Sequence, residues 1–224
     1  PGKIGKTYST SRNCVVAGST DYWVNLGDGT PLLCIPTEFN DGMIARMPDI
    51  LRQAAKLCGD RRITVVFDRG GSSAACYERI LAAGCDFVAY NRNPAAIDAE
   101  LFGPGPATIN GKTYDRSPYE RETDLAVYAR KPNGKYRKTK RTVAVREILV
   151  PRNGGGATSV VTSRRDLSRE QVAGIIFSRW TQENYFKYAI EEYNLDHLCV
   201  HGTEPVHPGI DHPNPEHVQL ERTI

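Results

Sequence analysis

Asp68 and Glu183 are the two acidic residues whose sequence surroundings suit metal-dependent chemistry. Asp68 directly follows a short β-branched run, residues 62–67, and is followed by Gly70 and Gly71. Ligands of open α/β sheets bind just beyond the carboxyl ends of strands, and glycines let a phosphate approach the backbone closely. Glu183 lies on a predicted helix that is apolar on nearly every side, where a carboxylate needs a cation or a metal as its partner.

Each of these two residues also has a purely structural interpretation. Asp68 can cap the following helix or pair with Arg69. Arg179, Glu183 and Lys187 recur every fourth residue, so they share one helix face and can form a ladder of ion pairs. The aromatic residues around Glu183 leave little polar surface for such a ladder, and this favours a functional role.

Two carboxylates from different elements are typical of a Mg²⁺ site, and Mn²⁺ takes the same oxygen ligands. Magnesium prefers oxygen ligands and completes its shell with water and phosphate. Two such ions, about 4 Å apart, activate an attacking oxygen and stabilise the leaving one. Two ions need at least three carboxylates, so a third acid must be sought.

A basic stretch between residues 128 and 141 is the second chemical feature. Its last twelve residues, 130–141, hold seven cations, and Tyr128 and Tyr136 are interleaved with the basic residues of the stretch. Such a stretch can follow a phosphate backbone, although charge runs often form solvated loops. The residues considered for DNA contact are Arg130, Lys131, Arg137, Lys138, Lys140 and Arg141, together with Arg179 and Lys187 on the helix.

Hydrophobic periodicity and turn residues predict the elements that position these side chains. Residues 21–26 and 31–36 flank a Gly-containing loop and predict an antiparallel hairpin. A helix is expected from Asp41 to about Leu57, interrupted at Pro48. Residues 62–67, a helix from Ser72 or Ser73, and residues 85–90 form a βαβ unit, whose two strands should be parallel.

The remaining chain predicts short strands and then one long helix. Asn-Gly and Pro-Asn-Gly turns between residues 94 and 156 indicate a β-rich insertion. Ser168 and Gln171 form a capping box that opens a helix running to about Glu192. The tail after Val200 has no periodicity, and we expect it to be extended.

Composition describes an ordinary globular protein. The 224 residues are 40% hydrophobic and 25% charged, with a net charge of +3, which by itself says little about nucleic acid. No apolar run approaches the ~18 residues of a membrane span, and no secretory signal is present. The six cysteines form no CxxC pair, which favours a reducing cytoplasm.

Four sequence segments together resemble the DDE transposases of bacterial insertion sequences, in the cut-and-paste group related to Tn5-type enzymes. They are Val-Val-Phe-Asp68-Arg-Gly-Gly, then Gly84-x-Asp-Phe-Val-x-Tyr, then Arg179-Trp-x-Gln-Glu183-Asn-Tyr-Phe-Lys187-Tyr, and Tyr193-Asn-Leu-Asp196. The order hairpin, helix, strand with Asp, helix, strand, β insertion and helix with Glu agrees with that family. The resemblance implies a ribonuclease-H-like α/β fold, in which a mixed sheet is flanked by helices.

The resemblance also implies roles for individual residues. Asp68 corresponds to the second of three metal-binding acids and Glu183 to the third. Arg179 corresponds to an arginine that engages DNA phosphate near the cut end, and Lys187 substitutes for the signature lysine by analogy only. The first acid lies on a first strand, expected at or before residue 1, so this piece alone should be inactive.

The expected organisation has four parts. Residues 1–93 form the first part of the ribonuclease-H-like core, 94–162 the β-rich insertion, 163–200 the core helix with the third acid, and 201–224 an extended tail. The expected partners are transposon ends and target DNA, bound by a homodimer in the bacterial nucleoid, without a membrane. The alternatives are another ribonuclease-H-like nuclease and a domesticated transposase that binds DNA without cutting it.

Overall fold

The computed structural model describes residues 5–9, 14–18, 20–37, 42–92, 94, 98–130, 135–153 and 155–193. Within the described ranges, side chains are described from Thr20 onward, except at Ala99, Arg130, 180–183, Phe186 and Tyr193. The chain divides into two units, Pro1–Tyr185 and Phe186–Ile224. Asp41, Lys131 and the tail 201–224 lie outside the described residues.

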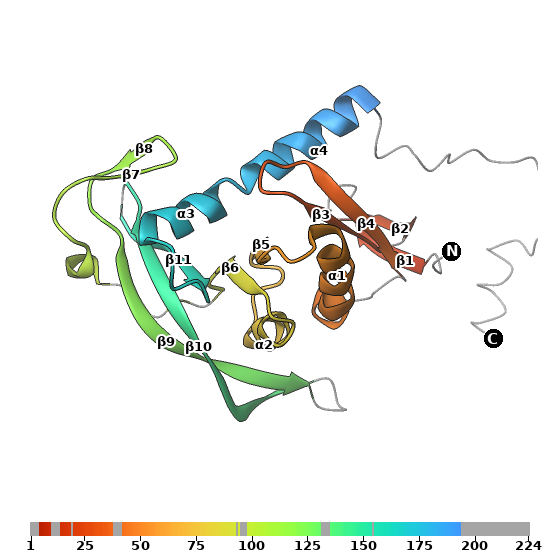
Figure 1. The fold of residues 1–224 in the computed structure, drawn as a ribbon, viewed down its shortest axis with the longest axis horizontal. Coiled ribbons are helices and arrows are strands. Elements are labelled where there is room, and N and C mark those ends of the chain that lie inside the picture. Colours follow the sequence, from red (N-terminus) through yellow and green to blue (C-terminus); the bar gives the residue numbers. More distant parts are fainter. Residues whose placement is uncertain are drawn as a thin grey trace, which may run out of the picture. The chain divides into compact units, whose positions relative to one another are not determined.

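The elements follow one another as shown in Figure 1. They are β1 (Gly5–Ser9), β2 (Cys14–Gly18), β3 (Thr20–Asn25), β4 (Pro31–Thr37), α1 (Met43–Cys58), β5 (Thr64–Phe67), α2 (Ala74–Ala82), β6 (Asp86–Tyr90), η1 (Ala99–Leu101), β7 (Ala107–Ile109), β8 (Lys112–Tyr114), β9 (Tyr119–Arg130), β10 (Tyr136–Pro151), β11 (Ala157–Thr162), α3 (Arg169–Phe177) and α4 (Trp180–Tyr193).

A five-stranded mixed sheet in the order β5-β6-β11-β10-β9 forms the centre of the first unit. β5 and β6 are parallel, with α2 between them in the chain, which confirms the predicted βαβ unit. β6, β11, β10 and β9 pair antiparallel. The strands of the predicted insertion therefore extend the same sheet as β5 and β6, while β7 and β8 form a small separate hairpin.

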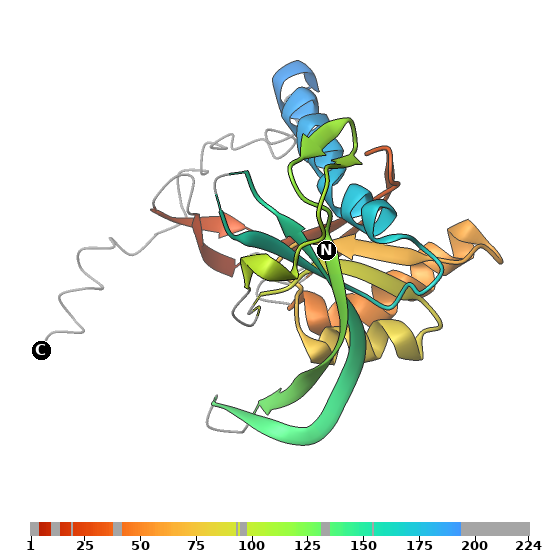
Figure 2. The ribbon, with the colours of Figure 1, turned by 90° about the vertical axis from the view of Figure 1, so that its left-hand side faces the viewer.

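Helices cover both faces of this sheet, as predicted. Along β6, Phe87 and Ala89 belong to a core with residues of α1 and α2, whereas Val88 belongs to a core with residues of α3. This alternation follows from the two-residue period of a strand. On the first face Tyr77 stacks on Phe87 with ring centroids 4.1 Å apart, which anchors α2 on the sheet. Figure 2 shows α2 and α3 against the sheet from a second direction.

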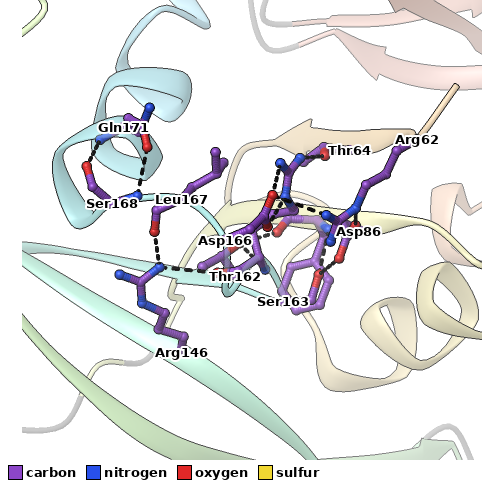
Figure 3. A network of polar contacts seen from close by, with 12 residues as sticks. Arg62, Thr64, Asp86, Arg146, Thr162, Ser163, Asp166, Leu167, Ser168 and Gln171 are labelled. Atoms are coloured by element: carbon purple, nitrogen blue, oxygen red, sulfur yellow. Dashed lines mark hydrogen bonds and ion pairs between the residues drawn. The ribbon is translucent and has the colours of Figure 1, made fainter.

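A polar network fixes the amino-terminal ends of β5 and β6 (Figure 3). Arg62 Nε donates to Asp86 Oδ2 at 2.6 Å, and Arg62 also pairs with Asp166 at 3.1 Å. Arg164 pairs with Asp166 at 2.7 Å and donates to Thr64 Oγ1 at 2.6 Å. Burial raises the pKa of Asp86, but the hydrogen bonds from Arg62 and Ser163 outweigh it, so the net pKa lies below the ordinary value. The network ties the strand ends to the loop before α3.

Two further hairpins precede the sheet in the chain. β3 and β4 pair antiparallel across the predicted Gly-containing loop. β1 and β2 also pair antiparallel, with Gly5 opposite Gly18.

The single long helix predicted after Ser168 is wrong, because the structure has two helices, α3 and α4. The capping box of Ser168 and Gln171 is present as predicted. The helix ends at Phe177, and at its C-cap the Ser178 amide and hydroxyl both donate to Gly174 O, at 3.0 and 2.7 Å. Burial on all sides was also predicted for this helix and is wrong for its later half, where Tyr188 and Ile190 are exposed.

The described cysteines and helices bear on the expected redox state and on membrane spans. Cys34, Cys58, Cys76 and Cys85 are free thiols. Among the described residues, no helix is long and apolar enough to cross a membrane.

Candidate functional site

Asp68 lies one residue beyond the carboxyl end of β5, as the sequence predicted, and its side chain is exposed. Its Oδ1 accepts a hydrogen bond from the Gly70 amide at 2.8 Å. This contact closes a local turn and orients the carboxylate. The next helix, α2, is capped by Ser73 instead, whose Oγ accepts from the Cys76 amide at 3.2 Å. Capping of that helix is therefore not the role of Asp68.

The turn after Asp68 is held by close packing. Gly71 is buried, and a Cβ added there would lie 2.8 Å from Cδ2 of Phe67 and against Met43 of α1. Ser72 Oγ and Tyr77 Oη are 2.8 Å apart and hydrogen bonded. Burial raises the pKa of Tyr77 to about 12, despite the opposing hydrogen bond to Ser72, so Tyr77 stays protonated in this contact. The turn that presents Asp68 is therefore fixed to both α1 and α2.

An apolar groove of about 530 Å³ connects Asp68 to the junction between α3 and α4. Its walls are β3, α1 and the whole of β5, and Ile175, Ser178 and Arg179 also line it. The structure thus places Asp68 and Arg179 on one groove, although they lie far apart in the sequence. This volume is within the range of about 300–1,000 Å³ found for ligand sites.

The α3–α4 junction carries the elements that place Glu183. Glu183 is in the first turn of α4, and its side chain lies outside the described residues. Asn110, at the tip of the β7–β8 hairpin, donates from Nδ2 to Gly174 O at 2.7 Å. Asn110 has φ 48, a left-handed conformation that asparagine tolerates better than most residues. The hairpin therefore fixes the last turn of α3, a contact that the sequence pattern does not predict.

The predicted stripe of Arg179, Glu183 and Lys187 is not continuous. Arg179 lies in the break between the helices, so the four-residue spacing places only Glu183 and Lys187 on one helix face. Lys187 belongs to the second unit, is exposed, and pairs with Glu191 at 3.9 Å.

The predicted basic stretch forms a two-stranded ribbon from β9 and β10 (Figure 1). Lys138 lies directly opposite Tyr128, and Tyr136 is two residues from Lys138 on the same face. Tyr128 and Tyr136 are 53% and 70% exposed. Arg137, Lys138 and Lys140 are also exposed, whereas Arg141 pairs with Glu78 of α2 at 3.2 Å. The ribbon presents aromatic and cationic groups side by side, as the interleaved sequence suggested.

Glu147 is a buried acid that the sequence interpretation missed. It is 1% exposed, and its carboxylate accepts from Ser159 Oγ at 2.6 Å, Asn91 Nδ2 at 2.8 Å and Arg121 Nε at 2.6 Å. Burial raises its pKa, but these three hydrogen bonds outweigh burial and hold the net pKa below the ordinary value. Because its carboxylate is satisfied within the sheet, Glu147 is a structural residue.

Within the side chains that the structure describes, no group of three His, Cys, Asp or Glu residues could hold a metal ion. Asp68 is the described member of the predicted set, and its exposed carboxylate has the hard oxygen donors that Mg²⁺ prefers. The magnesium site stays a prediction.

The fold and the site together define a mixed α/β protein with an acid at a strand end, beside a groove, and an exposed basic ribbon. A family model described as "Transposase protein" matches residues 2–224. The chain belongs to this transposase family, and DNA is therefore its partner. A search of curated proteins found no match.

Proposed function

We propose that this chain is the greater part of a DDE-type catalytic domain, which cleaves DNA at transposon ends and transfers the freed strand to target DNA. The observation that supports this most is the groove shared by Asp68 and Arg179. It joins a strand-end carboxylate to the residue that precedes the helix of Glu183. Membership of a transposase family agrees with this reaction.

Asp68 and Glu183 are the proposed metal ligands, together with a first acid from a strand that precedes this chain. Mg²⁺ or Mn²⁺, when bound, would lower the pKa of the attacking water and stabilise the leaving oxygen. The Gly70 amide holds Asp68 Oδ1 at 2.8 Å, so the carboxylate is oriented before any ligand arrives. Such orientation by a rigid turn is what a metal-binding carboxylate requires.

The proposed chemistry has two steps. In the first, a water oxygen attacks the phosphorus at the transposon end, the bond from phosphorus to the 3′ oxygen breaks, and that oxygen takes up a proton. In the second, the freed 3′-hydroxyl loses its proton as its oxygen attacks a phosphorus of the target strand, which releases a target 3′-hydroxyl. Arg179 is proposed to bind phosphate near the cut end, and a guanidinium suits this role because it binds phosphate through two parallel hydrogen bonds.

The experiment is a nicking and strand-transfer assay with the full-length protein, duplex DNA carrying the transposon end, and Mg²⁺. We expect Asp68→Asn and Glu183→Gln to lose nicking by at least about 1,000-fold, since the acids act together. Asp60→Asn and Glu192→Gln are matched controls, because both residues are exposed and Glu192 lies on the same helix as Glu183. Both controls should keep activity.

Other results of this assay would contradict the site or favour one of the alternative functions. Nicking retained in Glu183→Gln contradicts the assignment of the site. Nicking without strand transfer in the wild type indicates a hydrolytic nuclease, and binding without nicking indicates a domesticated DNA-binding protein. Synapsis of two ends by a homodimer is part of the proposal and can be measured by the mass of the protein–DNA complex.

A further inference from the structure

The exposed end of the β9–β10 ribbon lies at the opposite end of the sheet from Asp68. β5 and β6 are parallel, and β10 runs in the same direction because two antiparallel pairings separate it from β6. Arg146 of β10 is level with Val88 of β6, and Tyr136 precedes Arg146 by ten residues. Tyr136 therefore lies beyond the amino-terminal ends of β5 and β6, whereas Asp68 follows the carboxyl end of β5.

The strand register gives the separation between the ribbon end and Asp68. The row of paired residues that contains Phe67 ends at Arg121 of β9. Tyr128 lies seven residues further along β9, or about 23 Å at a rise of about 3.3 Å per residue. Successive nucleotides of one strand are about 3.4 Å apart in a duplex, so this length corresponds to roughly seven base pairs. A nucleotide bound at the ribbon end is therefore separate from one bound at Asp68.

One face of the ribbon end carries two tyrosines and a lysine. Lys138 is directly opposite Tyr128, and Tyr136 is two residues before Lys138, so the three side chains share a face. Tyr136 and Tyr128 are 70% and 53% exposed. Asp124 and Thr142, further along the same face, are exposed as well. Exposed aromatic rings that gather in one place mark a binding surface.

The opposite face of the ribbon end is anchored on the protein. Val127 is fully buried in the core formed with residues of α1 and α2, and Arg141 pairs with Glu78 of α2 at 3.2 Å. The bulge between these residues is closed by Thr139, whose Oγ1 donates to Val127 O at 2.8 Å and accepts from the Arg141 amide at 3.1 Å. The ribbon end is therefore held from behind while its aromatic face stays open to solvent.

Aromatic rings beside cations suit nucleotides whose bases are unpaired. The rings stack on the flat faces of the bases, which a duplex hides between neighbouring pairs, and the cations bind the phosphates. Tyr128 and Tyr136 are diagonal neighbours across the two strands, with Cα atoms about 7–8 Å apart. This is about twice the 3.4 Å between successive stacked bases. Arg137, Lys138 and Lys140 supply exposed cations at the same end of the ribbon.

We propose that the end of the β9–β10 ribbon is a second DNA-binding site, separate from Asp68, where Tyr128 and Tyr136 stack on the unpaired bases of single-stranded DNA. The three exposed cations bind the phosphates of this strand. They bind the phosphates of a duplex as well, but the two rings add affinity only for unpaired nucleotides. The site requires no metal and does not depend on the chemistry proposed for Asp68.

The experiment compares single-stranded and duplex DNA binding by the full-length protein in EDTA, which removes any contribution of a metal at Asp68. The probes are a labelled oligothymidine of about 12 nucleotides, a length within the span of known single-strand sites, and a labelled duplex. The double variant Tyr128→Leu/Tyr136→Leu should bind oligothymidine at least about 30-fold more weakly, for the loss of two stacking contacts. Its affinity for the duplex should not change. The matched control Tyr128→Phe/Tyr136→Phe keeps both rings and should keep both affinities.

Salt dependence separates stacking from phosphate binding. The leucine variant loses no charge, so its affinity for oligothymidine should be lower than that of the wild type at every salt concentration, with the same slope. Wild-type affinity for oligothymidine in the leucine variant overturns the proposal. An equal loss of oligothymidine and duplex binding also overturns it, because the rings then do not distinguish unpaired bases.

Photocrosslinking to the wild-type protein locates the site without any substitution. An oligothymidine that carries one 5-iodouracil forms a covalent bond, on irradiation, with the aromatic ring on which that base stacks. Crosslinked peptides that contain Tyr128 or Tyr136 support the proposal. Crosslinks confined to other parts of the chain, such as the surroundings of Asp68, overturn it.

Discussion

The β9–β10 ribbon allows a quantitative prediction about DNA binding. Arg137, Lys138 and Lys140 are exposed, and among the described residues none of them forms an ion pair. Each is therefore available to neutralise a DNA phosphate. Arg141 is set apart because it pairs with Glu78 at 3.2 Å. The perturbation is a triple variant in which Arg137, Lys138 and Lys140 are replaced by Gln.

The magnitude follows from counterion release. The logarithm of the binding constant falls with the logarithm of salt concentration with a slope of about −0.9 per neutralised phosphate. Loss of three contacts reduces the slope by about 2.7. Between 50 and 200 mM salt, a fourfold change, the wild type should therefore lose about 40-fold more affinity than the triple variant.

The assay is fluorescence anisotropy of a labelled DNA duplex, titrated at several salt concentrations. The control variant carries the same charge change elsewhere, with Gln at Lys56, Lys112 and Arg152, all exposed. The control should keep a slope close to that of the wild type, and urea unfolding checks that both variants are folded. If the ribbon variant and the control shift the slope equally, only net charge matters, and the ribbon is not a DNA-binding surface.

Three further predictions concern the structure around the site. Hydrogen bonds hold the pKa of Glu147 below its ordinary value, so its ionised carboxylate should stabilise the fold above the unfolded-state pKa. This stabilisation should be lost as pH falls through the folded-state pKa. Urea unfolding of Glu147→Gln should therefore show a free energy of unfolding lower by about 3–5 kcal/mol at pH 7, and the difference from wild type should shrink in acid. Gly71→Ala should cost about 1–3 kcal/mol by overpacking against Phe67, measured by the unfolding midpoint, and an unchanged midpoint would contradict the packing of the Asp68 turn. Asn110→Gly keeps the left-handed backbone and removes the hydrogen bond to Gly174, so it should cost about 1 kcal/mol, with Asn110→Ala more destabilising; equal effects would show that the hydrogen bond alone matters and that the left-handed backbone does not.

Features encoded by neighbouring residues could be predicted from the sequence. The β3–β4 hairpin depends on a Gly-containing loop, and α2 begins at Ser73 because its side chain caps the Cys76 amide. Asp68 was placed at a strand end because a β-branched run and two glycines flank it. Each of these features needs only local conformational preferences.

Features that depend on distant contacts could not be predicted. The end of α3 at Phe177 is fixed in part by Asn110, which is 64 residues away from Gly174 in the sequence. The buried carboxylate of Glu147 depends on Asn91, which directly follows β6, and on Arg121 of β9. The sequence Val-Arg-Glu in β10 does not indicate which charged side chain will be buried.

The two ends of β5 differ in a way that bears on function. At the amino-terminal end, Arg62, Asp86 and Asp166 form ion pairs that lock the strand ends to the loop before α3. At the carboxyl end, Asp68 is exposed and held by a single described hydrogen bond from Gly70. The ion pairs at one end and the parallel pairing with β6 along the strand support the position of β5, so the carboxylate at its other end can be exposed and still be positioned.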